Sequence, residues 1–333
     1  MLDERKAAIL RAVVQGYIET AQPVGSAVVA RAADLNVSSA TIRNEMAVLE
    51  RDGYLTQPHT SAGRIPTDKG YRFFVDALTP QGLLAPAQKV QVRDFFARAH
   101  GALEQVLHDT SQLLANLTHY ASVVVAPSAE GATVRSVQVV GLGPRTGIAV
   151  AILANGAIEK GTIEFDHDVG DERLAAATAH LSAHLGGVTL ADGDRVPATG
   201  DADTDAVVTA ATHALHRVPE GDAEHVFVGG ASRMASAFEA VDTVRQLLGV
   251  LEQEYVVVGL LREVIDRGVS VSIGTEHGDP PLSECSVVVA PYLVEGEAVG
   301  TIGVLGPTRM NYPHAMAAVA VVSQRLGRAL SEG

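Results

Sequence analysis

The first 78 residues divide into short segments whose order leaves few folds open. Helical spacing of apolar residues predicts a helix over 3–19, and Ser26 is placed to cap a short second helix. After the turn DLNV, Ser38 or Ser39 caps a third helix that runs to about Arg51. Two strand-like segments follow, YLTQ and GRIP, with the turn-rich PHTSA between them. Three helices and a hairpin in this order predict a winged helix-turn-helix, which is a DNA-binding module.

The third expected helix has one apolar face and one face suited to reading DNA. Ile42, Met46 and Leu49 lie at helical spacing, so we expect them to be buried. The opposite face carries small side chains, polar side chains and two arginines: Ala40, Thr41, Arg43, Asn44, Ala47 and Arg51. An asparagine can pair with adenine, and an arginine can pair with guanine or a phosphate. The alternative is an ordinary amphipathic helix with a solvated face, but the neighbouring helix and hairpin favour DNA.

The turn between the two strand-like segments is expected to form the wing. His59, Thr60 and Ser61 precede two small residues, and Arg64 follows them. Small and polar residues on a turn suit entry into a narrow groove or contact with phosphate. For Arg64 taken alone, the alternative to a DNA contact is a solvated surface charge.

The net charge of −14 argues against nucleic acid until its distribution is considered. Residues 1–80 contain nine Lys and Arg and nine Asp and Glu, so the whole negative excess lies in the rest of the chain. An acidic body repels a polyanion unless the N-terminal module holds it away from the DNA. We therefore expect a neutral DNA-binding module attached to an acidic body.

Cysteine content, the N-terminal sequence and hydropathy together predict a cytoplasmic protein. Cys285 is the single cysteine, so no internal disulfide can form, and we expect a buried structural thiol. The first twenty residues carry six charged side chains and lack the apolar block of a secretory signal. No apolar run approaches the roughly 18 residues that a membrane helix needs, so we expect no contact with a membrane.

The N-terminal sequence resembles that of a known family, the heat-inducible transcription repressors called HrcA. The similarity extends over PVGSAVVARAADLNVSSATIRNEMAVLERDGYLTQPHTSAGRIPTDKGYRFFVDAL and returns in VFVGGASRM and GTIGVLGPTRMNY. The second helix has more alanine than the family pattern, which affects packing rather than DNA reading. The resemblance implies that Ser39, Thr41, Arg43 and Asn44 read DNA, with His59 and Arg64 in the wing.

The resemblance also implies partners and an architecture. Members of the family repress chaperone operons, bind an inverted-repeat operator called the CIRCE element as homodimers, and depend on the chaperonin. Their fold is α+β and multidomain, with a GAF-like α/β domain interrupted by an inserted dimerisation domain. The expected division is a winged helix over 1–80, a linker and long helix over 81–119, GAF-like parts over 120–190 and 268–333, and the insertion over 191–267.

Apolar residues from Val92 to Leu117 step alternately by four and three, which is a heptad pattern. We expect one long helix here. It either pairs with the same helix of a second subunit or lies across the sheet of its own domain.

The sequence offers no recognisable enzyme, cofactor or metal site. The glycine-rich segments GLGPRTG and VGGAS lack the spacing of nucleotide-binding loops, and turns explain them. His180 and His184 are four residues apart on one expected helix, but no third ligand has metal-binding spacing. The predicted function is a heat-shock repressor modulated by chaperonin and heat. The alternative is a metabolite-responsive winged-helix regulator, and an enzyme fused to a DNA-binding module is the least favoured interpretation.

Overall fold

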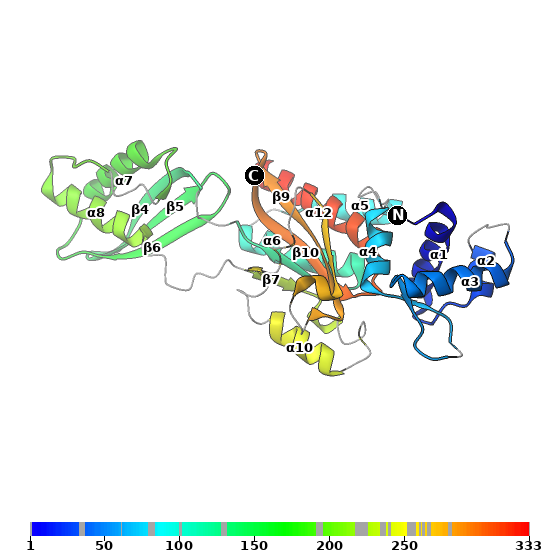
Figure 1. Ribbon diagram of the computed structural model, residues 1–333. Helices are drawn as coiled ribbons and strands as arrows, with labels where there is room; N and C mark the ends of the chain where they lie inside the picture. The colour runs from blue at the N-terminus through cyan, green and yellow to red at the C-terminus, as the bar shows by residue number, and fades with distance from the viewer. Residues whose placement is uncertain are drawn as a thin grey trace.

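The computed structural model shows an elongated chain with the winged helix at one end (Figure 1). Its described residues are 2–32, 37–60, 62–78, 84–99, 102–127, 132–190, 196–216, 226–233, 238, 241–251, 258–259, 261, 264, 268–278 and 282–332. None of the helices in these ranges combines the length and hydropathy that a bilayer span requires.

The N-terminal module has the predicted order of three helices and a hairpin, and a fourth helix follows them. They are α1 (Glu4–Thr20), α2 (Ser26–Ala32), α3 (Ser39–Arg51), β1 (Leu55–Thr56), β2 (Ile65–Pro66) and α4 (Asp68–Asp76). Local caps fix where the helices begin, because Asp3 accepts a hydrogen bond from the N–H of Lys6 and Ser38 accepts one from Thr41. The strands β1 and β2 pair antiparallel and form the wing hairpin. The module is a winged helix-turn-helix.

The prediction of a single long helix over 92–117 is wrong. The chain forms two helices, α5 (Pro86–Phe96) and α6 (Leu103–Thr118). The sequence has Gly101 between them, and glycine is a poor helix former. The helix α6 lies against its own domain's sheet, because Leu107 and Leu114 share an apolar cluster with Val124 of that sheet.

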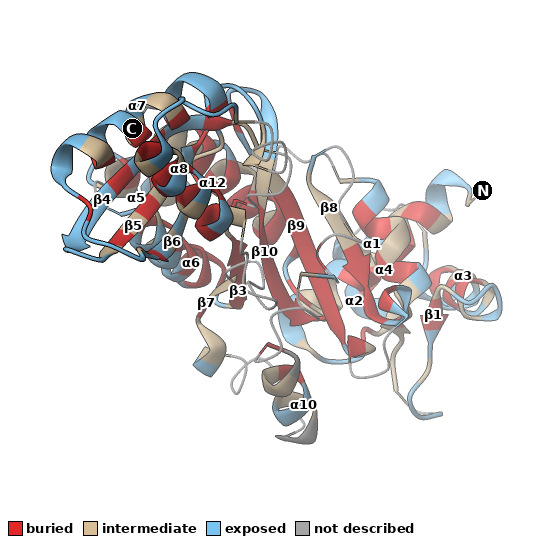
Figure 2. Ribbon diagram, turned by 90° about the vertical axis from the view of Figure 1, so that its left-hand side faces the viewer, coloured by how far each residue is buried: buried red, intermediate tan, exposed pale blue. Residues whose placement is uncertain are grey.

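Five strands form one antiparallel sheet in the order β7-β3-β10-β9-β8. They are β3 (Ala121–Val125), β7 (Val226–Gly229), β8 (Ser270–Ile273), β9 (Cys285–Val294) and β10 (Glu297–Pro307). Numbered by their position along the chain, the five strands lie in the order 2-1-5-4-3. This sheet belongs to the domain that was expected to be GAF-like. The helices α6 and α12 (Tyr312–Glu332) cover one face of the sheet, and α10 (Val241–Leu251) covers the other (Figure 2).

The remaining three strands form a separate sheet, so the expected division of the body is wrong. The strands β4 (Val134–Gly143), β5 (Thr146–Leu153) and β6 (Ile158–Glu164) pair with one another, and α7 (Asp171–Leu185) and α8 (Ala202–His216) cover one face. The expected division places these strands and α7 in the GAF-like domain (120–190) and the insertion over 191–267. Consecutive strands joined by tight turns pair with each other before they reach a distant sheet. The inserted domain therefore consists of β4, β5, β6, α7 and α8.

Candidate nucleic-acid interface

The two faces of α3 have the predicted environments. The side chains of Ile42, Met46 and Leu49 are buried in the core that α3 shares with α1. The opposite side of the helix is exposed and comprises Ser39, Ala40, Arg43, Asn44, Ala47 and Arg51. Thr41 is only half-buried. The predicted DNA-reading face is therefore accessible along the whole length of α3.

The first turn of α3 is held by short polar contacts. The Ser38 hydroxyl accepts a hydrogen bond from the N–H of Thr41 at 3.2 Å and lies 3.0 Å from the Thr41 hydroxyl. The Ser39 hydroxyl lies 3.1 Å from that of Ser26, the first residue of α2. These contacts bring the beginnings of α2 and α3 together on one exposed side, where hydroxyls and backbone N–H groups suit contact with phosphate.

The arginines of α3 differ in their surroundings. Arg43 makes no ion pair or hydrogen bond through its side chain within the described part of the chain. Arg51 lies 3.8 Å from the carboxylate of Asp52, and its side chain is 76% exposed. Both guanidinium groups are therefore available to bases or phosphates.

The wing loop is closed by one glutamine. The side-chain amide of Gln57 donates to the carbonyl oxygens of Thr60 at 3.0 Å and Ala62 at 2.9 Å. His59 and Thr60 are exposed at the tip of this loop. Ser61, which the sequence also placed here, lies outside the described residues.

Arg64 is not a solvated surface charge. Its guanidinium lies 2.9 Å from the carboxylate of Glu50 on α3, and its side chain is only 16% exposed. Its backbone N–H and C=O both pair with Val24, each at 2.9 Å. The preceding Gly63 passes so close that a Cβ there would lie 2.5 Å from the carbonyl oxygen of Val24. Arg64 thus fastens the wing to α3 and to the segment before α2, and a direct contact between Arg64 and DNA stays a prediction.

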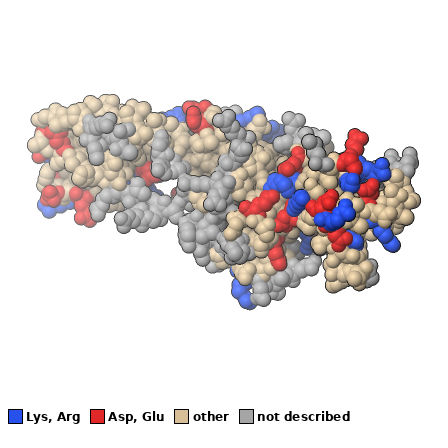
Figure 3. Space-filling view, viewed as in Figure 1, with Lys and Arg blue, Asp and Glu red and all other residues tan. Residues whose placement is uncertain are grey.

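The charges of the module are interspersed rather than uniformly basic. Lys and Arg gather at the winged-helix end of the molecule with acidic side chains between them (Figure 3). Part of this acidity is structural, because Glu45 of α3 lies 3.7 Å from Arg5 and 3.8 Å from Lys6 of α1. The basic groups that face solvent on α3 are therefore not neutralised by that carboxylate.

The sequence analysis named Ser26 only as a cap of the second helix, and it missed Gln57 and Glu50. Ser26 links the beginnings of α2 and α3, Gln57 holds the wing loop and Glu50 holds Arg64. The signal for Gln57 was its place beside a loop of small residues. Glu50 carried no signal, because its partner belongs to another element.

Outside the module, the structure describes the groups that the sequence set aside. The ring of His180 lies 4.3 Å from that of His184, and its Nε2 lies 2.6 Å from the carbonyl oxygen of Pro197. No group of three metal-binding side chains occurs among the described residues. Cys285 is fully buried, as predicted, and burial raises the pKa of its thiol to about 12.

Comparisons with known proteins agree with this architecture. The family described as HrcA protein C terminal domain matches residues 104–316. The heat-inducible transcription repressor HrcA of Nocardioides sp. is 39% identical over all of both chains, and that of Nocardia farcinica is 38% identical over 99% of this chain and 97% of its own. A crystal structure of a hypothetical protein shares the fold, with a TM-score of 0.68 and 23% identity over 100% of this chain and 99% of that one. The chain belongs to the family of heat-inducible transcription repressors HrcA.

Proposed function

We propose that the chain represses heat-shock chaperone operons in the cytoplasm by binding a CIRCE-type inverted-repeat operator as a homodimer, with chaperonin and heat modulating its activity. The observation that carries this proposal is the exposed face of α3, where Arg43 and Asn44 stand opposite the buried stripe. The full-length similarity to heat-inducible repressors supplies the regulatory part. The proposal assigns no catalytic activity to the chain.

Residue roles follow from the geometry of α3 and the wing. Arg43 and Asn44 would read base edges, because guanidinium and amide groups pair bidentately with guanine and adenine. Ser39, Thr41 and Arg51 would contact phosphates or flanking bases, while Ala40 and Ala47 allow close approach. His59, Thr60 and Ser61 would enter the adjacent groove from the wing. Arg64 would hold the wing against α3 through its ion pair with Glu50.

We propose that the second copy binds through the open face of the inserted domain's sheet. The helices α7 and α8 cover only one face. The other face carries six apolar side chains: Val140, Leu142, Ile148, Val150, Ile152 and Ile158. Within it, Val140 pairs with Ile148, and Ile152 pairs with Ile158. Leu142 is 64% exposed and Ile158 is 54% exposed. Large contiguous apolar patches are rare on monomeric proteins. A second copy of the chain is the occupant that an inverted repeat requires, because its two half-sites call for a two-fold symmetric protein.

Sedimentation of variants tests this contact. Ile152→Asp introduces a charge on the open face, and we expect it to shift the protein from dimer to monomer. Ala183→Asp adds the same charge on the exposed side of α7, and we expect it to leave the dimer intact. A dimeric Ile152→Asp protein would contradict the assignment of this face.

Operator binding tests the repressor function. Fluorescence anisotropy would compare an inverted-repeat duplex with a scrambled duplex of the same composition at stated salt, with and without chaperonin. We expect selective binding that warming weakens and chaperonin restores. Selective binding that neither treatment changes would contradict the regulatory part. Equal binding to both duplexes would contradict the operator and favour the metabolite-responsive regulator.

A further inference from the structure

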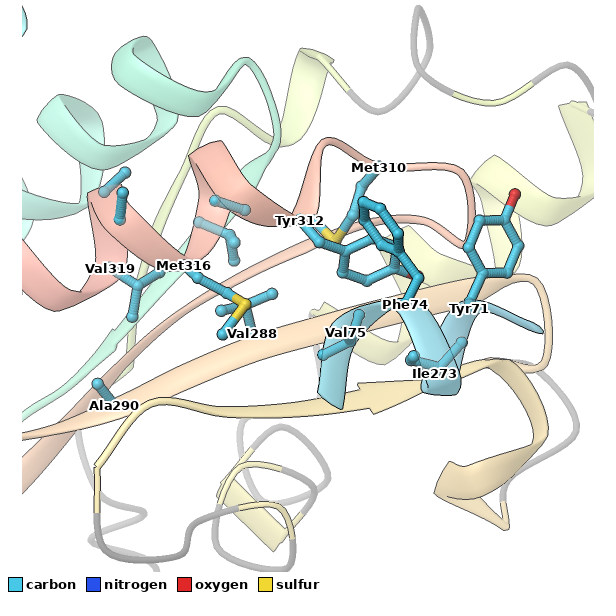
Figure 4. Close-up of a cluster of buried hydrophobic side chains, with 14 of the residues drawn as sticks. Tyr71, Phe74, Val75, Ile273, Val288, Ala290, Met310, Tyr312, Met316 and Val319 are labelled. Atoms are coloured by element: carbon cyan, nitrogen blue, oxygen red, sulfur yellow. The ribbon is translucent and has the colours of Figure 1, made fainter. Parts of the chain in front are cut away.

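The winged helix is packed directly onto the GAF-like domain through α4. Tyr71, Phe74 and Val75 are buried in the same apolar cluster as Ile273 of β8 and Tyr312 of α12 (Figure 4). The rings of Tyr71 and Tyr312 lie 5.8 Å apart between centroids. The cluster continues through the module to α1 and α3, so one continuous core joins the DNA-reading helix to the body.

A bidentate ion pair adds a directional contact to this junction. The Arg72 Nε donates to Glu276 Oε1 at 2.8 Å, and Nη2 donates to Oε2 of the same carboxylate. The same Nη2 also donates to the carbonyl oxygen of Val271 at 2.7 Å. The Glu276 carboxylate is itself oriented, because the N–H of Ile273 donates to it at 2.9 Å. Bidentate pairs of this kind fix the angle between their partners as well as the distance.

A second polar contact lies one helical turn earlier on α4. The Asp68 Oδ2 accepts hydrogen bonds from the N–H of Thr275 at 3.1 Å and from its hydroxyl at 2.8 Å. Gly274 permits this approach, because a Cβ there would lie 2.6 Å from Asp68 Oδ2. Its φ of +54° is also a conformation that glycine adopts without strain. Glycine at position 274 therefore leaves room for the Asp68 carboxylate.

The two contacts act together on the orientation of the module. Asp68 and Arg72 are four residues apart, so they lie on one side of α4 and both contact segment 271–276. An apolar contact alone is non-directional and tolerates rotation about its centre. Two polar contacts one turn apart resist such rotation. The angle of α3 relative to the body is thereby set at the α4 junction.

We propose that Asp68 and Arg72 are positioning residues that determine which half-site spacing the dimer accepts. The inference rests on the proposed reading of an inverted repeat by a dimer. Each added base pair shifts one half-site by about 3.4 Å and rotates it by about 34°. A module held at a fixed angle tolerates little of this rotation, whereas a module that can turn tolerates more. The contacts of Asp68 and Arg72 would thus select spacing without touching DNA.

The test measures the affinity of each protein for a native inverted repeat and for repeats whose spacer is one or two base pairs longer or shorter. We expect the ratio of native to altered affinity to fall about tenfold in Arg72→Met relative to wild type. Thr275→Val removes one hydrogen-bond donor to Asp68 and should lower this ratio by less than Arg72→Met does. Arg145→Met is the matched control, because it breaks the Arg145–Asp168 pair at 3.0 Å in the inserted domain and should leave the ratio unchanged.

A charge-swapped pair separates positioning from stability. Arg72→Glu should lose spacing discrimination, and Arg72→Glu combined with Glu276→Arg should recover part of it at the same junction. Far-ultraviolet circular dichroism verifies that each variant is folded, and Thr275→Val supplies the test if Arg72→Met is not. Unchanged discrimination in a folded Arg72→Met or Thr275→Val protein would overturn this inference alone. Failure of the wild type to bind any repeat would overturn the proposed function and this inference with it.

Discussion

Arg43→Ala removes an exposed guanidinium from the DNA-facing side of α3. No hydrogen bond or ion pair of this side chain occurs within the described residues, so the free energy of unfolding should change by no more than about 0.5 kcal/mol. The loss should therefore appear in DNA binding. A bidentate contact with guanine is worth about 1–3 kcal/mol. A dimer carries two copies of Arg43, so the operator affinity should fall by about 2–6 kcal/mol, or about 30-fold to more than about 10,000-fold.

Anisotropy titrations at constant salt would measure this loss on the operator and on a scrambled duplex. Arg98→Ala is the control, because it removes one exposed positive charge from the turn after α5, outside the module. We expect operator affinity to fall in Arg43→Ala while scrambled-duplex affinity changes little. Equal weakening on both duplexes would show that Arg43 contacts phosphate, and unchanged affinity on both would refute a contact by this face of α3.

Three further predictions concern stability and electrostatics. Leu49→Ala should cost about 2–5 kcal/mol in denaturant unfolding, because Leu49 is fully buried behind the DNA-reading face, and a loss below about 1 kcal/mol would contradict that packing. Burial raises the pKa of the Glu276 carboxyl, but hydrogen bonds from Arg72 and Ile273 lower it more, so the net pKa lies below its usual 4.5. The stabilisation from this group should be complete above the usual pKa and lost as pH falls through the lowered value, so the difference in unfolding free energy between wild type and Glu276→Gln should shrink on acidification; a constant difference would argue against the pairing. Operator affinity should decline steeply with salt, because neutralised phosphates release counterions, and a flat response would contradict groove binding.

The elements of the N-terminal module could be predicted because local residues determine them. Apolar spacing identified the buried side of α3, and the serine cap located its beginning. Gly53 has a φ of +80°, as expected of a residue that ends a helix in the left-handed region. Glu295 and Gly296, at the turn between β9 and β10, both have positive φ, which tight hairpin turns require. In each case the deciding contacts lie within a few residues.

The division of the body into a GAF-like domain and an inserted domain could not be predicted, because the propensity of a segment to form a strand does not determine which strand it pairs with. The apolar segments that form β4, β5 and β6 favour strands, but strand propensity alone fits either sheet. The ion pairs of Arg64 and Arg72 could not be predicted for the same reason. Arg64 pairs with a residue of another element, and Arg72 pairs with Glu276, 204 positions further along the chain. Such contacts follow from the assembled fold.

Binding of the purified protein to an inverted repeat decides whether a dimer reads DNA through α3. The measurement compares three duplexes of equal length at one salt concentration, which are the full repeat, a single half-site and a scrambled sequence. We predict tight binding to the full repeat, much weaker binding to the half-site and only salt-sensitive nonspecific binding to the scrambled duplex. Equal affinity for all three duplexes would contradict a dimer that reads sequence through α3.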